Sequence, residues 1–278
     1  WTLVPLAALL IVPVWLAAEL LVQRLVAALV PPRVPPRLDL ARVARMRDGH
    51  RRGLDDRFKT LVAVPCLLTD EPTIATLFER LERHHVASAV GPFAQQLTFA
   101  LLADLPDSQH EVDDADAALL DRAHERLATV RARHPDARFM LLTRRRLLND
   151  AEDVWMGWER KRGKLMELNS LILRGEQGTF SESVDAAALA GTRYVITLDA
   201  DTLLPPGAAA ELVGTLAHPL NRARRDGSGR VVEGYTVLQP RVEIAPQSAS
   251  RSRFSRLVAG SRGLDLYTLA VSDSYMDL

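Results

Sequence analysis

Several features that mark common enzyme and binding classes are absent from this chain of 278 residues. It has neither a Gly-x-x-x-x-Gly-Lys-Ser/Thr loop nor a Gly-x-Gly-x-x-Gly turn, so an ATPase and a dinucleotide-binding domain would both lack their usual phosphate cradle. Its seven histidines show no metal-ligand spacing, and no nucleophile elbow supports Ser-His-Asp chemistry. Because 35 basic residues balance 35 acidic ones, we do not expect the chain to bind nucleic acid through its overall charge.

Cysteine is nearly absent as well. The single Cys66 excludes an internal disulfide and a metal site built from several thiolates. Because this residue lies on an apolar segment that is typical of a strand, we expect a buried and inert thiol there.

The amino-terminal 30 residues contain little charge. Residues 1–18 carry none, and apolar character resumes after Glu19, Gln23 and Arg24, so the segment is long enough to cross a hydrocarbon core of about 30 Å. A signal peptide fits less well, because a basic segment and a small-residue cleavage site are both missing. We therefore expect a transmembrane helix over 1–30.

A linker and collar over 31–58, rich in proline and arginine, is expected to follow this helix. Seven arginines between positions 33 and 52 place the rest of the chain in the cytoplasm, by the positive-inside tendency. Because the chain starts without Met, we expect it to be a fragment of a longer protein.

From residue 59 onward, apolar runs typical of strands alternate with segments of helical spacing. This alternation predicts an α/β domain over 59–278, with an open, mostly parallel sheet flanked by helices. In such sheets, ligands bind at the carboxyl ends of the strands. We expect strands over 60–65, 96–102, 138–143 and 194–198, helices over 71–85, 113–133, 159–173 and 208–217, and an extended segment over 232–242.

The most informative motif is an Asp-x-Asp pair, Asp199 and Asp201, directly after the apolar run 194–198. Residues i and i+2 beyond a buried strand can converge on one hard cation, and carboxylate oxygens suit Mg²⁺ or Mn²⁺. A metal that is held by few protein groups and completed by phosphate oxygens is a common way to bind a nucleotide diphosphate. Surface turns also produce this spacing, so the position after a strand is what favours a metal site.

Three other places could contact a ligand. Asp104, at a predicted strand end, could accept hydrogen bonds from a uracil imide or a ribose, or could be a turn aspartate. In the Trp-Met-Gly-Trp-Glu-Arg-Lys-Arg-Gly-Lys stretch, the cations Lys161, Arg162 and Lys164 could neutralise a pyrophosphate, or could form a solvated basic helix face. Gln239 could touch a donor sugar or an acceptor, or could belong to a structural loop.

Taken together, these motifs resemble the glycosyltransferase region of bacterial cyclic β-1,2-glucan synthases, glycosyltransferase family 84. The resemblance extends from about the Pro-rich linker to the last residue, and the Trp-Met-Gly-Trp string is far more specific than Asp-x-Asp. The matching runs include Thr-Leu-Val-Ala-Val-Pro at 60–65, Phe-Ala-Leu-Leu-Ala-Asp at 99–104, Val-Trp-Met-Gly-Trp-Glu-Arg-Lys-Arg-Gly-Lys-Leu at 154–165, Tyr-Val-Ile-Thr-Leu-Asp-Ala-Asp-Thr at 194–202 and Leu-Gln-Pro-Arg-Val at 238–242.

The resemblance implies a GT-A-like, Rossmann-like transferase domain at the bacterial inner membrane, with its catalytic part in the cytoplasm. It implies an inverting enzyme that uses UDP-glucose and Mg²⁺ or Mn²⁺ to extend a growing β-1,2-glucan acceptor, which is then closed into a ring. By position, Asp199 and Asp201 would hold the metal and the donor diphosphate, Asp104 would meet the uridine, and Lys164 would support the diphosphate. Gln239 is the fifth expected donor-binding residue.

The resemblance also implies a carboxylate base that deprotonates the acceptor hydroxyl. The matching region lies beyond Leu278, so no catalytic residue is assigned in this chain. Two alternatives stay open. One is a catalytically incomplete, membrane-tethered domain that binds a nucleotide sugar or acts as a scaffold, and the other is a synthase of the same fold that makes another β-glycan.

Overall fold

The computed structural model describes residues 34–46, 54–89, 91–181 and 184–240, together with single positions between 11 and 29. It contains two compact units, Arg37–Gly234 and a second unit composed of Trp1–Pro36 and Tyr235–Leu278. Every helix and strand named below belongs to Arg37–Gly234.

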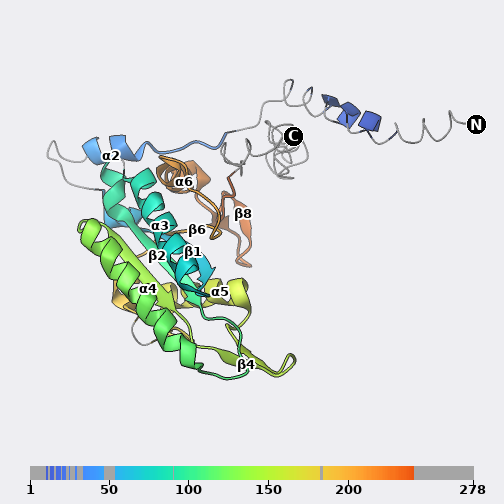
Figure 1. The fold of residues 1–278 in the computed structure, drawn as a ribbon. Coiled ribbons are helices and arrows are strands. Elements are labelled where there is room, and N and C mark those ends of the chain that lie inside the picture. Colours follow the sequence, from blue (N-terminus) through green and yellow to red (C-terminus); the bar gives the residue numbers. More distant parts are fainter. Residues whose placement is uncertain are drawn as a thin grey trace, which may run out of the picture. The chain divides into compact units, whose positions relative to one another are not determined.

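A parallel sheet forms the centre of this unit (Figure 1). Its strands are β1 (Thr60–Leu67), β2 (Leu97–Asp104), β3 (Arg138–Thr143) and β6 (Tyr194–Thr197). They lie in the order β3-β2-β1-β6. β1 pairs with β2 along its whole length, so that Leu67 lies opposite Asp104, but it pairs with β6 only as far as Ala63 opposite Thr197. The edge strand β6 therefore ends level with the middle of β1.

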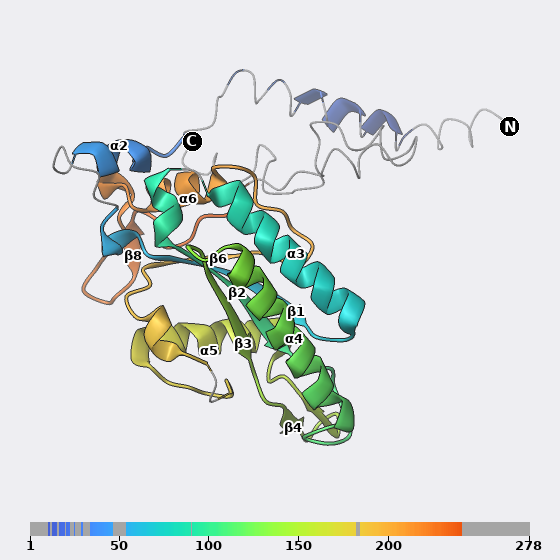
Figure 2. The ribbon, with the colours of Figure 1, turned by 60° about the vertical axis from the view of Figure 1, so that its left-hand side comes forward.

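Helices cover both faces of the sheet (Figures 1 and 2). The helices α3 (Glu71–Ser88), α4 (Asp114–Arg133) and α6 (Ala208–Leu216) pack on one face, whereas α5 (Arg160–Arg174) and the short 3-10 helix η3 (Ala186–Leu189) pack on the other. Because successive strand residues point to opposite faces, the apolar runs supply two cores. Val62 and Phe99 belong to the first core, and Leu61 and Leu102 belong to the second.

Shorter elements surround this three-layer arrangement. Two antiparallel pairs lie outside the central sheet, β4 (Leu147–Asn149) with β5 (Val154–Met156) and β7 (Arg224–Arg225) with β8 (Val231–Glu233). The remaining elements are α2 (Leu40–Met46) and the 3-10 helices η1 (Asp56–Phe58), η2 (Pro92–Gln96) and η4 (Pro219–Asn221).

The structure confirms an α/β domain with a parallel sheet flanked by helices. Each predicted strand and helix is present, and its ends differ from the expected ones by at most three residues; for example, α3 continues to Ser88. The extended segment expected over 232–242 is present only as the short β8, and residues 241–242 lie outside the described residues. The β4–β5 hairpin was not predicted, because three-residue strands are too short to show an alternating pattern.

Most of the predicted transmembrane segment 1–30 lies outside the described residues. Within the part of the chain that the structure does describe, no helix combines the length and the apolar character needed to span a bilayer. The transmembrane helix therefore stays a prediction. In the predicted linker and collar over 31–58, positions 31–33 and 47–53 are likewise outside the described residues.

Candidate functional site

The helix α5 begins with an unusual backbone conformation. Its N-cap residue Glu159 and its first residue Arg160 have positive φ angles of 50° and 47°. This left-handed conformation costs a residue other than glycine about 1 kcal/mol or more. The side chain of Glu159 does not cap this end of the helix. Such a conformation persists only where surrounding contacts fix the backbone.

The guanidinium of Arg144, directly after β3, supplies these contacts. Its Nη1 and Nη2 atoms each donate to the carbonyl oxygen of Trp158 at 3.2 Å, and Nη2 also donates to the carbonyl oxygen of Arg160 at 3.3 Å. The same guanidinium donates to both carboxylate oxygens of Asp104, with Nε–Oδ1 at 2.8 Å and Nη2–Oδ2 at 3.0 Å. Arg144 therefore joins the carboxyl end of β2 to the first residues of α5.

Lys164, in the first turns of α5, completes a set of charges that is buried below the helix. Its Nζ atom forms an ion pair with Asp104 Oδ2 at 2.9 Å and donates to the carbonyl oxygen of Cys66 at 2.7 Å. Glu167 Oε2 lies 3.5 Å from Arg144 Nη1. We call Asp104, Arg144, Lys164 and Glu167 the buried cluster. Its two positive and two negative charges balance, which is the condition under which buried charges are tolerated.

Two glycines allow the chain to pass close to the buried cluster. A side chain at Gly157 would collide with the carboxylate of Asp104, and one at Gly163 would collide with the carbonyl oxygen of Trp158. Only a residue without Cβ fits such close approaches. Both glycines of the Trp-Met-Gly-Trp-Glu-Arg-Lys-Arg-Gly-Lys string are therefore explained by packing.

The Asp-x-Asp pair lies in a hydrogen-bonded turn directly after β6. The N–H of Thr202 donates to the carbonyl oxygen of Asp199 at 2.9 Å, so Asp201 occupies one of the two central positions. Both aspartates are exposed, whereas Leu198 before the turn and Leu204 after it are buried in the core. The two leucines anchor the turn and leave two carboxylates in solvent.

Asp199 forms an ion pair with Lys161 of α5, and we call these two residues the exposed pair. Their side chains remain 59% and 53% exposed, compared with 7% for Asp104 and 6% for Lys164. Lys161 and Lys164 are three residues apart and so lie on one side of the helix. Each engages an aspartate at the carboxyl end of a different strand. Asp201 has no hydrogen bond or ion pair with any residue that the structure describes.

The donor set around this turn fits part of a metal site. Within the described ranges, no group of three or more His, Cys, Asp or Glu side chains could hold a metal ion. Mg²⁺ at nucleotide sites is bound by one or two carboxylates, and substrate phosphates and water complete its coordination. The two exposed carboxylates match that requirement, provided that Lys161 shares or releases Asp199.

The four predicted site residues within Arg37–Gly234 lie in two different environments. Asp104 and Lys164 contact each other inside the buried cluster, so direct contact with a donor would require their present bonds to open. Asp199 and Asp201 lie together in the exposed turn. Gln239 is exposed and belongs to the other compact unit. Donor contacts of all five residues remain predictions.

Cys66 is buried and free, as expected. Burial raises the pKa of its thiol to about 12, and the nearby charge of Lys164 offsets this only in part. Because the thiolate is the nucleophilic form, Cys66 is inert at neutral pH.

Three arginines, Arg144 to Arg146, follow β3 at the edge of the sheet where ligands are expected, and the sequence gives none of them a specific role. Arg144 organises the buried cluster, and Arg146 binds the carboxylate of Asp116 with Nη1–Oδ2 at 2.5 Å and Nη2–Oδ1 at 2.8 Å. Arg145, between them, is exposed. Three adjacent arginines at a strand end were the available signal, but only the structure shows which of them are buried.

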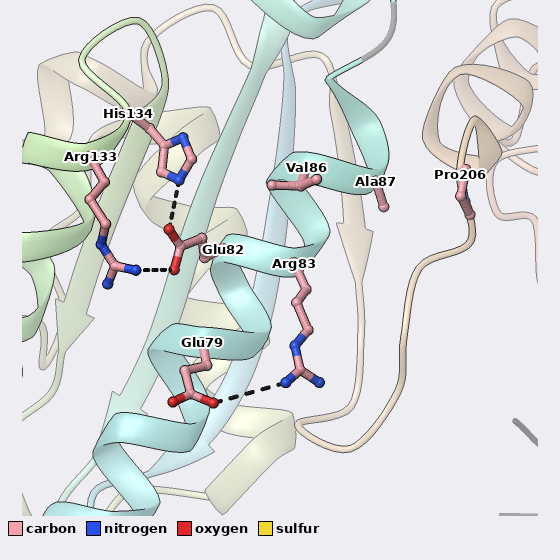
Figure 3. Close-up of a pocket in the computed structure, with 8 residues that line it drawn as sticks. All are labelled: Glu79, Glu82, Arg83, Val86, Ala87, Arg133, His134 and Pro206. Carbon is pink, nitrogen blue, oxygen red and sulfur yellow. Dashed lines mark hydrogen bonds and ion pairs between the residues drawn. The ribbon is translucent and has the colours of Figure 1, made fainter. Parts of the chain in front are cut away.

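A pocket of about 720 Å³ lies between the carboxyl-terminal half of α3, the end of α4 and Pro206 (Figure 3). Its charged side chains are paired with one another; Glu82, for example, lies 2.9 Å from Arg133 and 2.7 Å from His134. None of the predicted site residues lines this pocket. It is therefore separate from the candidate site.

Comparison with known proteins gives independent information about this chain. No protein-family model matches it. It is 43% identical over 231 residues to the cyclic beta-(1,2)-glucan synthase NdvB of Rhizobium meliloti. The match includes 81% of this chain but only 8% of the length of that relative. The chain therefore belongs among the relatives of cyclic β-1,2-glucan synthases, which confirms the resemblance predicted from its motifs.

Proposed function

We propose that this chain is the donor-binding part of a membrane-bound, inverting glycosyltransferase that transfers glucose from UDP-glucose to a growing β-1,2-glucan. The similarity to a cyclic β-(1,2)-glucan synthase supports the class of product. The observation that carries the proposal is the exposed turn after β6, which presents Asp199 and Asp201 next to the cationic start of α5. Ligands of open α/β sheets bind beyond the carboxyl ends of the strands, where this turn lies.

Asp199 and Asp201 would hold Mg²⁺ or Mn²⁺ through their carboxylate oxygens. When bound, such a cation offsets the negative charge that develops on the departing UDP. Two protein ligands are enough, because the donor phosphates and water supply the others. The exposure of both carboxylates supports this role, since neither must be uncovered before a ligand binds.

Among the positive charges of the protein, that of Lys161 would lie nearest to the donor diphosphate. It is exposed, it already lies next to Asp199, and the amino end of a helix favours an anion. Lys164 was the residue expected in this role, but its Nζ is engaged by Asp104 and by the carbonyl oxygen of Cys66. Lys164 would then support the diphosphate indirectly, by holding α5 in place.

Asp104 would act through the same buried cluster, and its direct contact with the uridine would need the bonds to Arg144 or Lys164 to open. Gln239 stays a predicted donor-binding residue on sequence grounds alone. We further propose that residues 1–30 anchor the protein in the bacterial inner membrane, with the transferase domain in the cytoplasm, and that the carboxylate base lies beyond Leu278.

Replacing Asp201 by alanine tests the proposal most directly. We expect Asp201→Ala to weaken the binding of UDP in the presence of Mn²⁺ about a hundredfold, measured by calorimetry. Transfer from radiolabelled UDP-glucose should also fall about a hundredfold or more. The thermal midpoint should hardly change, because Asp201 is exposed and makes no bond to a described residue.

Asp150→Ala is the matched control, because Asp150 is an exposed aspartate in the β4–β5 turn. It should leave both UDP binding and transfer unchanged. Near-normal transfer by Asp201→Ala would refute the assignment of the metal site. UDP binding without transfer would favour a nucleotide-sugar-binding module, and a different linkage in the labelled product would favour a synthase of another β-glycan.

A further inference from the structure

One side of α3 makes a series of contacts with the chain that follows β6. The contacts recur at positions i, i+4 and i+7 of α3, which lie on a single face of a helix. They are Arg80 Nη1 donating to the carbonyl oxygen of Ala200, the N–H of Leu204 donating to His84 Nδ1 at 3.4 Å, and the N–H of Gly207 donating to the carbonyl oxygen of Ala87 at 3.4 Å. Residues 200–207 therefore run along two turns of α3, and Figure 3 shows the far end of this contact, where Pro206 faces Ala87.

The first of these contacts acts on the peptide group between the two aspartates. The turn is closed by the bond from Thr202 N–H to the Asp199 carbonyl, so its central peptide joins Ala200 to Asp201. That peptide can take two orientations, which distinguish type I from type II turns. The type II orientation requires a positive φ at the second central residue, and Asp201 is not among the described residues with positive φ.

We propose that Arg80 is a positioning residue for the proposed metal site. Its bond to the Ala200 carbonyl holds the central peptide in the observed orientation. The orientation of that peptide sets the direction in which the side chain of Asp201 leaves the backbone, and so sets where its carboxylate lies relative to Asp199. The inference rests on the proposed function, because it concerns the turn that would hold the cation.

The surroundings of Arg80 support its role in holding the peptide between Ala200 and Asp201. Arg80 is half-buried, and it forms no ion pair within the part of the chain that the structure describes. One turn further along, His84 is buried, and its burial, together with the charge of Arg80, lowers the pKa of its imidazole to about 4. His84 is therefore neutral near pH 7, and its Nδ1 can accept the hydrogen bond from Leu204. This second contact fixes the chain beyond the turn, so that Arg80 acts on a segment that is already anchored.

Arg80→Met tests the proposal, because methionine keeps much of the aliphatic side chain but cannot donate to the carbonyl. Arg83→Met is the matched control, since Arg83 lies on the same helix but is exposed and pairs with Glu79 at 4.0 Å. Two measurements are made on each protein. One is the affinity for UDP in the presence of Mn²⁺, and the other is amide hydrogen exchange over residues 199–207.

We expect Arg80→Met to bind UDP about tenfold more weakly and to exchange faster at the amides of Thr202 and Leu204. Arg83→Met should match the unaltered protein in both measurements. Arg80→Lys should recover part of the affinity, because an ammonium group can still donate to a carbonyl. A loss of stability alone would not be reversed in this way.

Unchanged exchange over 199–207 in Arg80→Met would overturn the inference, and so would faster exchange with unchanged UDP affinity. If the unaltered protein binds UDP and Arg80→Met binds it equally well, this inference fails while the proposed function stands. If the unaltered protein binds no UDP at any Mn²⁺ concentration, the proposed function fails, and this inference fails with it.

Discussion

Two lysines one turn apart on α5 lie in opposite surroundings. Lys164 is inside the buried cluster, where its ammonium group meets Asp104 and the carbonyl oxygen of Cys66. Lys161 is more than half exposed and, among the residues that the structure describes, pairs only with the exposed carboxylate of Asp199. Buried charges persist only when each one is compensated, whereas an exposed ion pair contributes little to stability. The first turns of α5 therefore carry, on one side of the helix, a buried lysine that stabilises the fold and an exposed lysine that presents its charge to solvent.

The largest effect on stability is expected from replacing Arg144, the central residue of the buried cluster. Arg144→Met would leave Asp104 with Lys164 as its remaining cation, and it would remove the side-chain donor to the carbonyl oxygen of Trp158 and one donor to that of Arg160. We expect a loss of about 3–5 kcal/mol in the free energy of unfolding, measured with urea. The matching change in the exposed pair, Lys161→Met, should cost less than about 1 kcal/mol. Equal losses for the two variants would show that the two sites do not differ as described.

A fall in pH should weaken the anchoring of the chain after the exposed turn, because His84 accepts a hydrogen bond from Leu204 there. The folded pKa of His84, about 4, lies below its ordinary value of 6.5, so the unfolded chain takes up the proton first as the pH falls. The contribution of neutral His84 to the free energy of unfolding is fully present above pH 6.5. It should be lost progressively as the pH approaches 4, which lowers the free energy of unfolding by about 2 kcal/mol. Urea unfolding between pH 7 and pH 4.5 measures the loss.

His84→Gln is the control for this pH effect, because glutamine can accept the bond from Leu204 but does not titrate. The difference between the two unfolding free energies should shrink as the pH falls. Parallel pH profiles for the two proteins would exclude His84 as the source of the change.

The smallest effect is expected from a change within the exposed pair. Lys161→Gln should weaken UDP binding about fivefold, because it removes one exposed cation near the diphosphate, and it should change stability by less than about 0.5 kcal/mol. Arg162→Gln is the control, since Arg162 is exposed one residue further along and pairs with Glu159. Calorimetry with UDP and Mn²⁺ measures both variants. An equal decrease for both would indicate a diffuse charge effect and would remove the special role of Lys161.

The fold could be predicted to within a few residues, because its signals are local. The runs in β1, β2 and β3 are apolar at nearly every position, as strands covered on both faces must be, and α3 shows helical spacing between helix signals such as the N-cap Asp70. The β4–β5 hairpin escaped prediction because its strands are short. Residues 1–30 remain a sequence-based prediction.

The candidate site was less predictable, because its assignment depends on which charges are buried. Lys161 and Lys164 belong to one basic run, and the sequence offered no way to distinguish the buried one from the exposed one. Asp104 and Asp199 both lie at the carboxyl ends of apolar runs, but β2 lies inside the sheet and β6 at its edge. Strand order is a property of the whole sheet, so it sets their different exposure without leaving a local signal.

The amino-acid sequence alone determined the alternation of strands and helices, the position of the Asp-x-Asp turn after a strand and the kinship with cyclic β-1,2-glucan synthases, since each depends on residues that are neighbours along the chain. Only the tertiary structure decided that Arg144 binds Asp104, that Lys161 rather than Lys164 reaches solvent, and that Arg80 contacts Ala200. These pairings join segments between 38 and 120 residues apart, and their energies depend on burial, which is established only when the sheet and its helices have assembled.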